Sequence, residues 1–333
     1  MSGKPRVAVI GTGGTISFLG ADSLDVLDYA ESEAMLDADE LVARFPECAR
    51  VADVVPVRYA TLPSTALGPP QWLAMLDLIH ATCAADRALA GLVISHGTAT
   101  LEETAYFLNL TLKIDLPVVV VGAQRPPTAL STDAGMNLVN AIRVAGSPAA
   151  RGNGVLVCLN DEIQAAREVT KTSTYRLQTF RSPDFGVLGH VDGDGVFFYR
   201  APVRRRAPDT EFDVRGRTSL PRVDIVLSYA GADATMVEAA IAAGARGIVS
   251  AGFPPGMPAA IERGALERAR EHGIVVVQSS RAGSGRIAPR RYLRSKGLIA
   301  ADNLTPQKAR ILLMIALAHT EDPAELARIF GEY

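Results

Sequence analysis

The chain has 333 residues, of which 48% are hydrophobic and 21% charged, and its formal net charge is −2. A charge so close to zero offers no electrostatic attraction to nucleic acid or to an anionic membrane, so a small-molecule substrate is the expected partner. The length is roughly twice that of a typical domain and predicts two domains, each able to bury a core.

The cysteines and the first residues of the chain both indicate where in the cell the protein is located. The three cysteines, Cys48, Cys83 and Cys158, have no CxxC spacing, which favours reduced core thiols over a disulfide framework or a zinc site. The opening Met-Ser-Gly-Lys-Pro-Arg leads directly into an apolar strand without the apolar segment of a signal peptide or a membrane anchor. We therefore expect a cytoplasmic protein.

The first part of the chain alternates between strand and helix patterns. Short apolar runs bounded by turn residues predict buried parallel strands, because both faces of each run are apolar. These runs cover residues 7–10, 92–94, 118–121 and 155–159. Helices are predicted over residues 71–79, which follow two prolines, and over residues 101–112, where Glu102 and Glu103 lie in the first turn.

The first part ends with a strand pair predicted near residues 186–199. Residues 201–221 hold three consecutive arginines and three prolines without sustained periodicity, which predicts a connector between domains. Strands are then predicted over residues 223–227, 247–250 and 274–277, and helices over 234–243, 259–271, 306–318 and 323–330. We therefore predict a two-domain α/β fold in which each domain is a mainly parallel sheet flanked by helices. The predicted boundaries are 1–200 for the N-terminal catalytic domain, 201–221 for the linker and 222–333 for the C-terminal domain.

Two glycine-rich turns carry threonine hydroxyls directly after predicted strands. Residues 11–15 read Gly-Thr-Gly-Gly-Thr, and residues 95–100 read Ser-His-Gly-Thr-Ala-Thr. Ligands of open parallel sheets bind beyond the carboxyl ends of the strands, so Thr15 and Thr98 are candidate partners in catalysis. A lone threonine would more often cap a turn or helix, and Thr12 is open to the same interpretation. The first turn is not a dinucleotide fingerprint, because Ile16 stands where a third glycine is required.

These motifs resemble those of the bacterial L-asparaginase/glutaminase family. The resemblance rests first on residues 13–16 and on residues 96–108, and it continues through residues 121–126, 160–161, 169–172 and 304–310. It therefore covers nearly the whole chain. It implies a two-domain asparaginase-like fold and an amidohydrolase that needs no cofactor and no metal. His96 is then expected to be structural, and Asp133 to stabilise a turn.

The resemblance also implies catalytic roles. Thr15 would attack an acyl carbon and form a covalent acyl-enzyme, with Lys171 as the base. Thr98 would link or orient these two groups, and Tyr29 would lie on a mobile loop, where it positions Thr15 and closes the site against water. The competing interpretations are a solvated lysine and a half-buried loop tyrosine.

The recognition residues depart from the family pattern. The family reads Thr-Asp where this chain reads Thr98-Ala99, and the missing carboxylate grips the α-amino group of the substrate. Ser64 matches the serine that holds the substrate carboxylate, and Thr65 stands where glutamine is common. We also assign Gly14 and Gly97 to the substrate-binding turns.

The C-terminal domain departs further. Residues 252–257 replace a loop that contains asparagine, and residues 285–291 supply arginines where the family offers a glutamate. The sequence therefore predicts a substrate without an α-ammonium group, such as a carboxamide, a lactam or a related acyl compound. The alternatives are a weakened true L-asparaginase/glutaminase and a non-catalytic ligand-binding homologue. Because the family builds each site from two subunits, we expect a homotetramer that is a dimer of dimers.

Overall fold

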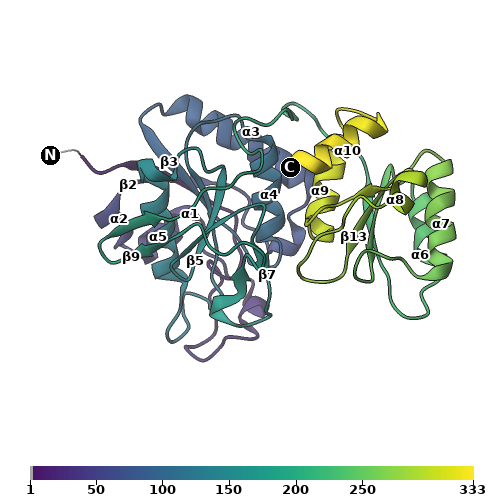
Figure 1. Cartoon of the computed structure of the whole chain (residues 1–333). Helices are drawn as coiled ribbons and strands as arrows, with labels where there is room; N and C mark the ends of the chain where they lie inside the picture. Colours follow the sequence, from purple (N-terminus) through teal and green to yellow (C-terminus); the bar gives the residue numbers. More distant parts are fainter. Residues whose placement is uncertain (1–2) are drawn as a thin grey trace. The chain divides into compact units, whose positions relative to one another are not determined.

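The computed structural model describes residues 3–333. The chain forms two compact units, and it passes from the first to the second between Thr210 and Glu211. This passage lies inside the segment 201–221 that the sequence marks as a connector. Each unit has its own sheet and its own helices (Figure 1).

The first unit is built on an eight-stranded sheet with the order β10-β9-β6-β5-β4-β3-β1-β2. Five strands are mutually parallel: β1 (Arg6–Gly11), β2 (Asp53–Arg58), β3 (Leu89–Ser95), β4 (Val118–Val121) and β5 (Val155–Leu159). Three strands extend it by antiparallel pairing: β6 (Glu162–Ala165), β9 (Gly189–Asp192) and β10 (Gly195–Phe198). A separate two-stranded hairpin pairs β7 (Thr170–Lys171) with β8 (Phe180–Arg181).

Helices cover both faces of this sheet. One face packs against α1 (Ala38–Arg44), α2 (Cys48–Val51) and α5 (Ala134–Ala145), and alternate strand residues such as Val7, Val9 and Val93 join their core. The opposite face is covered by α3 (Pro69–Ala85) and α4 (Leu101–Thr111). Four short 3₁₀ helices lie in the loops: η1 (Tyr29–Ser32), η2 (Ser64–Ala66), η3 (Pro148–Ala150) and η4 (Leu177–Thr179).

The second unit is a smaller sheet of four parallel strands, β11 (Val223–Leu227), β12 (Gly247–Gly252), β13 (Val275–Ser280) and β14 (Ile299–Ala300). Helices α6 (Thr235–Ala242) and α7 (Ala260–Glu271) pack on one face, and α9 (Pro306–Ala316) packs on the other beside α10 (Pro323–Glu332). A short helix, α8 (Arg291–Ser295), precedes β14.

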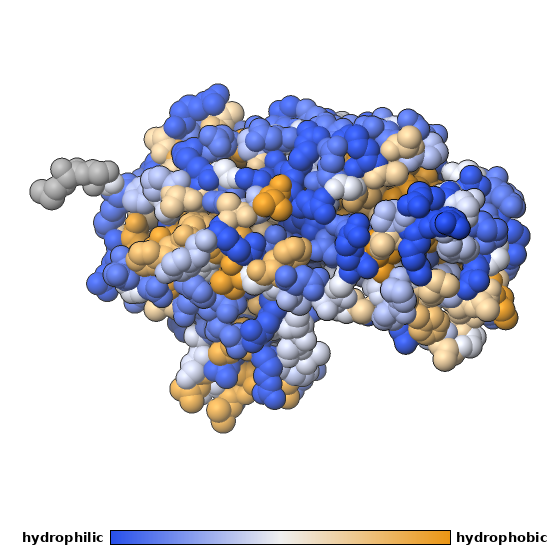
Figure 2. All heavy atoms as spheres, viewed as in Figure 1, coloured by the Kyte–Doolittle hydropathy of each residue, from blue (hydrophilic) through white to orange (hydrophobic). Residues whose placement is uncertain are grey.

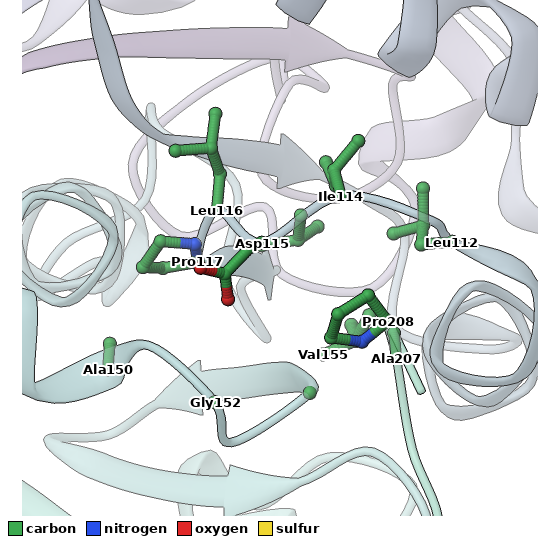
Figure 3. A pocket seen from close by; sticks show the side chains of 12 residues that line it. Leu112, Ile114, Asp115, Leu116, Pro117, Ala150, Gly152, Val155, Ala207 and Pro208 are labelled. Carbon is green, nitrogen blue, oxygen red and sulfur yellow. The ribbon is translucent and has the colours of Figure 1, made fainter. Parts of the chain in front are cut away.

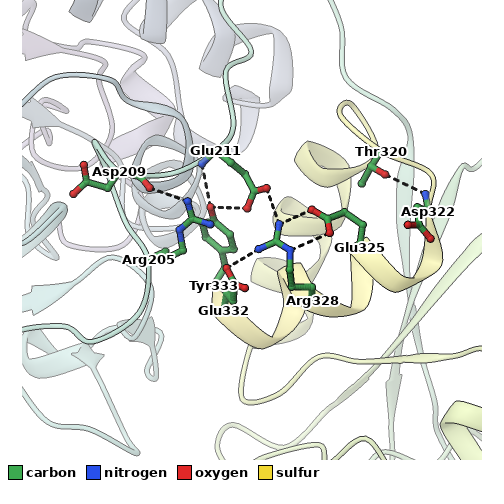
Figure 4. Close-up of polar contacts among 9 residues, drawn as sticks. All are labelled: Arg205, Asp209, Glu211, Thr320, Asp322, Glu325, Arg328, Glu332 and Tyr333. Atoms are coloured by element: carbon green, nitrogen blue, oxygen red, sulfur yellow. Dashed lines mark hydrogen bonds and ion pairs between the residues drawn. The ribbon is translucent and has the colours of Figure 1, made fainter.

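An ion-pair network ties the start of the second unit to its last helix. Arg328 on α10 contacts carboxylate oxygens of Glu211, Glu325 and Glu332, each at 2.6 Å (Figure 4). The Tyr333 hydroxyl donates to Glu211 at 3.0 Å and accepts from its backbone N–H. Because one guanidinium serves three carboxylates, the contacts form a network rather than isolated surface pairs.

The predicted fold class is confirmed, and so are the predicted strands and helices, with ends that differ by a few residues. The largest such difference is α3, which is predicted over residues 71–79 and spans Pro69–Ala85. The sequence pattern does not reveal β2, because this edge strand is only half buried and contains Pro56. It also does not reveal α1, although Asp37 and Glu40 form a capping box at its start.

Candidate active site

The two threonine turns lie side by side at the carboxyl edge of the first sheet. Strands β1 and β3 are neighbours, and Gly11 is paired with Ser95 where both strands end. Thr12 then donates to the Ser95 carbonyl from its N–H at 3.1 Å and from its hydroxyl at 2.8 Å. Thr12 therefore stabilises the pair of turns, which is the structural role considered for it from the sequence.

Glycine allows the two turns to approach closely. Gly14 has φ +81°, and a Cβ at this position would lie 2.1 Å from the Gly97 Cα. A Cβ at Gly97 would in turn lie 2.7 Å from the Ser64 hydroxyl. Larger residues would separate the turns, so these glycines bring the segments that carry Thr15, Thr98 and Ser64 into one place.

Thr15 forms a pair with Tyr29. The two hydroxyl oxygens are 2.8 Å apart, and both side chains are half buried. Tyr29 begins η1, and its ring lies 5.9 Å from the ring of Phe18. The segment after β1 therefore folds back toward the first threonine turn, so that the Tyr29 hydroxyl lies within hydrogen-bond distance of the Thr15 hydroxyl.

Lys171 forms a pair with Thr98. The Lys171 ammonium donates to the Thr98 hydroxyl over 2.7 Å, and Thr98 is buried. Burial lowers the pKa of Lys171, and the negative charge of Glu102 acts in the opposite direction. The net lowering increases the fraction of neutral amine, which is the form that can accept a proton.

Two residues that the sequence analysis did not assign to the site hold the hairpin of Lys171. Gln164, which is buried on β6, donates from Nε2 to the Phe180 carbonyl at 2.7 Å. Its Oε1 accepts from the Ser182 hydroxyl at 2.9 Å. Glu102 on α4 accepts from the Lys171 backbone N–H at 3.2 Å. Glu102 could have been noticed from the sequence, because it is an acidic residue in the first turn of a predicted helix. No sequence pattern points to Gln164.

His96 is a buried structural residue, as the sequence predicts. It is fully buried, and its Nδ1 and Nε2 lie 2.8 Å from the Gly97 carbonyl and the Thr104 hydroxyl. The Trp72 indole donates to that hydroxyl at 2.9 Å, so the Thr104 proton is directed at Nε2 and the His96 proton at the Gly97 carbonyl. This chain of hydrogen bonds fixes the backbone directly before Thr98.

His96 should make the stability of the protein depend on pH. Burial lowers its pKa to about 4 from 6.5, so between these values the unfolded chain binds a proton that the folded chain does not. The contribution of His96 to the free energy of unfolding is therefore fully present above pH 6.5, and it is lost as the pH drops toward 4. The loss amounts to about 3 kcal/mol in the free energy of unfolding.

Denaturant unfolding of the wild-type protein and a His96→Gln variant across this pH range measures the effect. The variant should be less stable at neutral pH and should lose less stability on acidification. Equal pH dependence in both proteins would show that His96 titrates normally.

Family models identify the relationship of this chain. Residues 6–204 match the model described as Asparaginase, N-terminal. Residues 222–330 match the model described as Glutaminase/Asparaginase C-terminal domain. The chain belongs to the asparaginase family.

Individual members of the asparaginase family are similar over almost the whole chain. L-asparaginase 2 of Bacillus subtilis is 41% identical over 99% of this chain and 87% of its own length. The glutaminase-asparaginase of Pseudomonas fluorescens is 40% identical over 98% of this chain and 90% of its own length. The crystal structure of a probable cytoplasmic L-asparaginase from Campylobacter jejuni has a TM-score of 0.94 and 39% identity, covering 99% of this chain and 100% of that chain. This chain therefore shares the two-domain α/β fold of the Campylobacter jejuni structure and belongs to a family of amidohydrolases.

The residues assigned to substrate recognition lie around the paired turns of this asparaginase fold. Ser64 is buried at the start of η2, and its carbonyl accepts from the Thr100 hydroxyl at 2.8 Å. Thr65 and Ala99 are exposed. Ala99 thus brings a methyl group, and no charge, to the surface directly after Thr98.

Asp133 stabilises a turn, as predicted. Its carboxylate accepts from the backbone N–H groups of Gln124 and Arg125 at distances of 2.9 to 3.1 Å. In the second unit the two divergent segments contact each other, because Arg290 donates to the Gly256 carbonyl at 3.1 Å. Arg286 of the same segment pairs with Asp302.

One small pocket lies well away from the threonine turns. A small pocket in the first unit is lined by Val118 and Val155, which begin β4 and β5, together with Asp115 and mostly apolar neighbours (Figure 3). It therefore lies at the amino edge of the sheet, opposite the threonine turns. Among residues 3–333 no cluster of three or more His, Cys, Asp or Glu side chains could hold a metal ion. In the same range no helix is long and apolar enough to cross a membrane.

Proposed function

We propose that this asparaginase-family protein hydrolyses the terminal carboxamide of a small carboxylic acid that has no α-ammonium group, with Thr15 as the nucleophile. The observation that carries the proposal is the placement of the Lys171 amine on the Thr98 hydroxyl, directly beside the turn of Thr15. A threonine hydroxyl needs a base, and a buried lysine with a lowered pKa is a suitable one.

The reaction proceeds through an acyl-enzyme. The Thr15 oxygen forms a bond to the carboxamide carbon, and its proton passes through the Thr98 hydroxyl to the neutral Lys171 amine. The C–N bond then breaks, and ammonia leaves with that proton. A water molecule attacks the ester, returns a proton to Thr15 and releases the carboxylic acid. Tyr29 holds the Thr15 hydroxyl in position by the 2.8 Å contact.

Ala99 is the basis for the proposed substrate. An α-ammonium group beside this residue would lose water contacts without gaining a carboxylate, which costs more than leaving a neutral group there. The buried Ser64 hydroxyl, close to Gly97, remains available to hold a substrate carboxylate. A terminal amide with one carboxylate and no amine fits both features.

Two substrates that differ by one group test this proposal. Succinamate is asparagine without the α-ammonium group, so steady-state kinetics on both compounds isolates the effect of that group. We expect kcat/KM for succinamate to exceed that for asparagine by tenfold or more, about the value of one charge-assisted hydrogen bond. A preference for asparagine would instead support a true L-asparaginase, the activity that the names of the relatives indicate. Turnover of neither compound, nor of other amides, would support a non-catalytic binding protein.

The exposed apolar side chains and the cysteines support an oligomeric state and a cellular location. We propose a homotetramer arranged as a dimer of dimers, supported by the exposed apolar side chains of Leu24, Leu27, Leu130 and Met136 on the first unit. Hydrophobic residues are visible among the hydrophilic surface of this unit (Figure 2). A cytoplasmic location is supported by the three cysteines, which are free thiols, although one relative is named a probable periplasmic L-asparaginase.

A further inference from the structure

Glu102 is a buried carboxylate beside the proposed base. The residue is only 6% exposed, and its Oε2 accepts from the Lys171 backbone N–H at 3.2 Å. It stands in the first turn of α4, where the helix dipole favours a negative charge. The carboxylate therefore lies directly against the backbone of the residue that carries the proposed base.

The other residues near Lys171 differ from Glu102 in charge or position. Across the hairpin, Lys171 is paired with Phe180, and the charged Arg181 is opposite Thr170 and exposed. The turn after β3 contributes the neutral Thr98 and Ala99. Glu103 follows Glu102 on α4, and the charge that raises the pKa of Lys171 is that of Glu102.

We propose that Glu102 is a positioning residue for the proposed amide hydrolysis, fixing the Lys171 backbone by a hydrogen bond and favouring the ammonium form of its side chain by its charge. The inference rests on the proposed role of Lys171 as a base. Burial favours the neutral amine of Lys171, whereas the charge of Glu102 favours its ammonium form. These two opposing effects together set the pKa of Lys171. Lys171 can then both accept the proton and hold it until ammonia leaves.

A Glu102→Gln variant separates charge from hydrogen bonding. The amide oxygen of glutamine can still accept from the Lys171 N–H, but the negative charge is lost. Because that charge raises the pKa of Lys171, its removal should lower the pKa, and the acidic limb of the kcat/KM profile should move to lower pH. Glu103→Gln, which neutralises the adjacent residue in the same helical turn, should leave the limb in place.

Glu102→Asp provides a second measurement if the glutamine variant does not fold. It keeps the charge but withdraws it by one methylene, so the limb should move in the same direction by a smaller amount. An acidic limb unchanged in the folded Glu102 variants would overturn the proposal, as would an equal shift in Glu103→Gln. A Lys171→Met variant distinguishes this failure from that of the proposed function: if it keeps full activity, Lys171 is not the base, whereas loss of activity together with an unmoved limb rejects only the role of Glu102.

Discussion

Replacing Thr15 with alanine is expected to lower kcat/KM on the preferred amide on the order of 10⁴-fold or more, because the acyl-enzyme can no longer form. Thr15→Ser keeps a hydroxyl and should retain measurable turnover. Lys171→Met should cost about 10²- to 10⁴-fold through loss of proton transfer. Lys171→Arg should be equally inactive, since a guanidinium keeps the positive charge but does not release its proton at any working pH.

Thermal unfolding and circular dichroism of the same variants show whether these losses are chemical. Thr82→Ala is a matched control, because it removes a threonine hydroxyl that only bonds the Leu78 carbonyl of its own helix, α3. It should keep wild-type kinetics. Wild-type turnover by a folded Thr15→Ala protein would transfer the nucleophilic role to Thr98 or remove it.

Restoring a carboxylate at position 99 is expected to change substrate preference. Ala99→Asp should raise the ratio of kcat/KM for asparagine to that for succinamate by about 10- to 100-fold, the range of a charge-assisted hydrogen bond to an ammonium group. Activity on succinamate should fall, since the new charge would face that substrate without a partner.

Ala99→Asn is the control for size, because it adds nearly the same atoms without the charge. It should leave the ratio within a few-fold of wild type. If aspartate and asparagine at this position change the ratio equally, or if neither changes it, the side chain at position 99 does not contact the ligand, and the proposed substrate class is wrong.

Much of the fold follows from local patterns in the sequence. The buried runs of β1, β3, β4 and β5 are apolar on both faces because helices cover both sides of the sheet, and this makes them recognisable without a structure. The edge strand β2 has a short apolar run too, but Pro56 lies within it and its residues are only half buried. The hairpin β7 and β8 has only two residues in each strand and is held by side chains such as Gln164 rather than by an apolar pattern.

The site could be predicted as a set of residues but not as contacts. The motifs place Thr15 and Thr98 after neighbouring strands, whereas Lys171 reaches Thr98 across 73 residues of sequence through a hairpin with no strong signal. The Tyr29 contact depends on the irregular path of the segment after β1. Burial of Glu102 beside Lys171 depends on how α4 packs against the hairpin, and a charged residue in the first turn of a helix is usually exposed.

Mass spectrometry can detect the acyl group on Thr15 during turnover. The wild-type protein would be mixed with excess succinamate, quenched in acid while turnover continues, and digested for peptide mapping. We expect a mass gain of one succinyl group on the peptide that contains Thr15, and no such gain in Thr15→Ala. A succinyl group on the Thr98 peptide, or steady turnover without any acylated peptide, would contradict it.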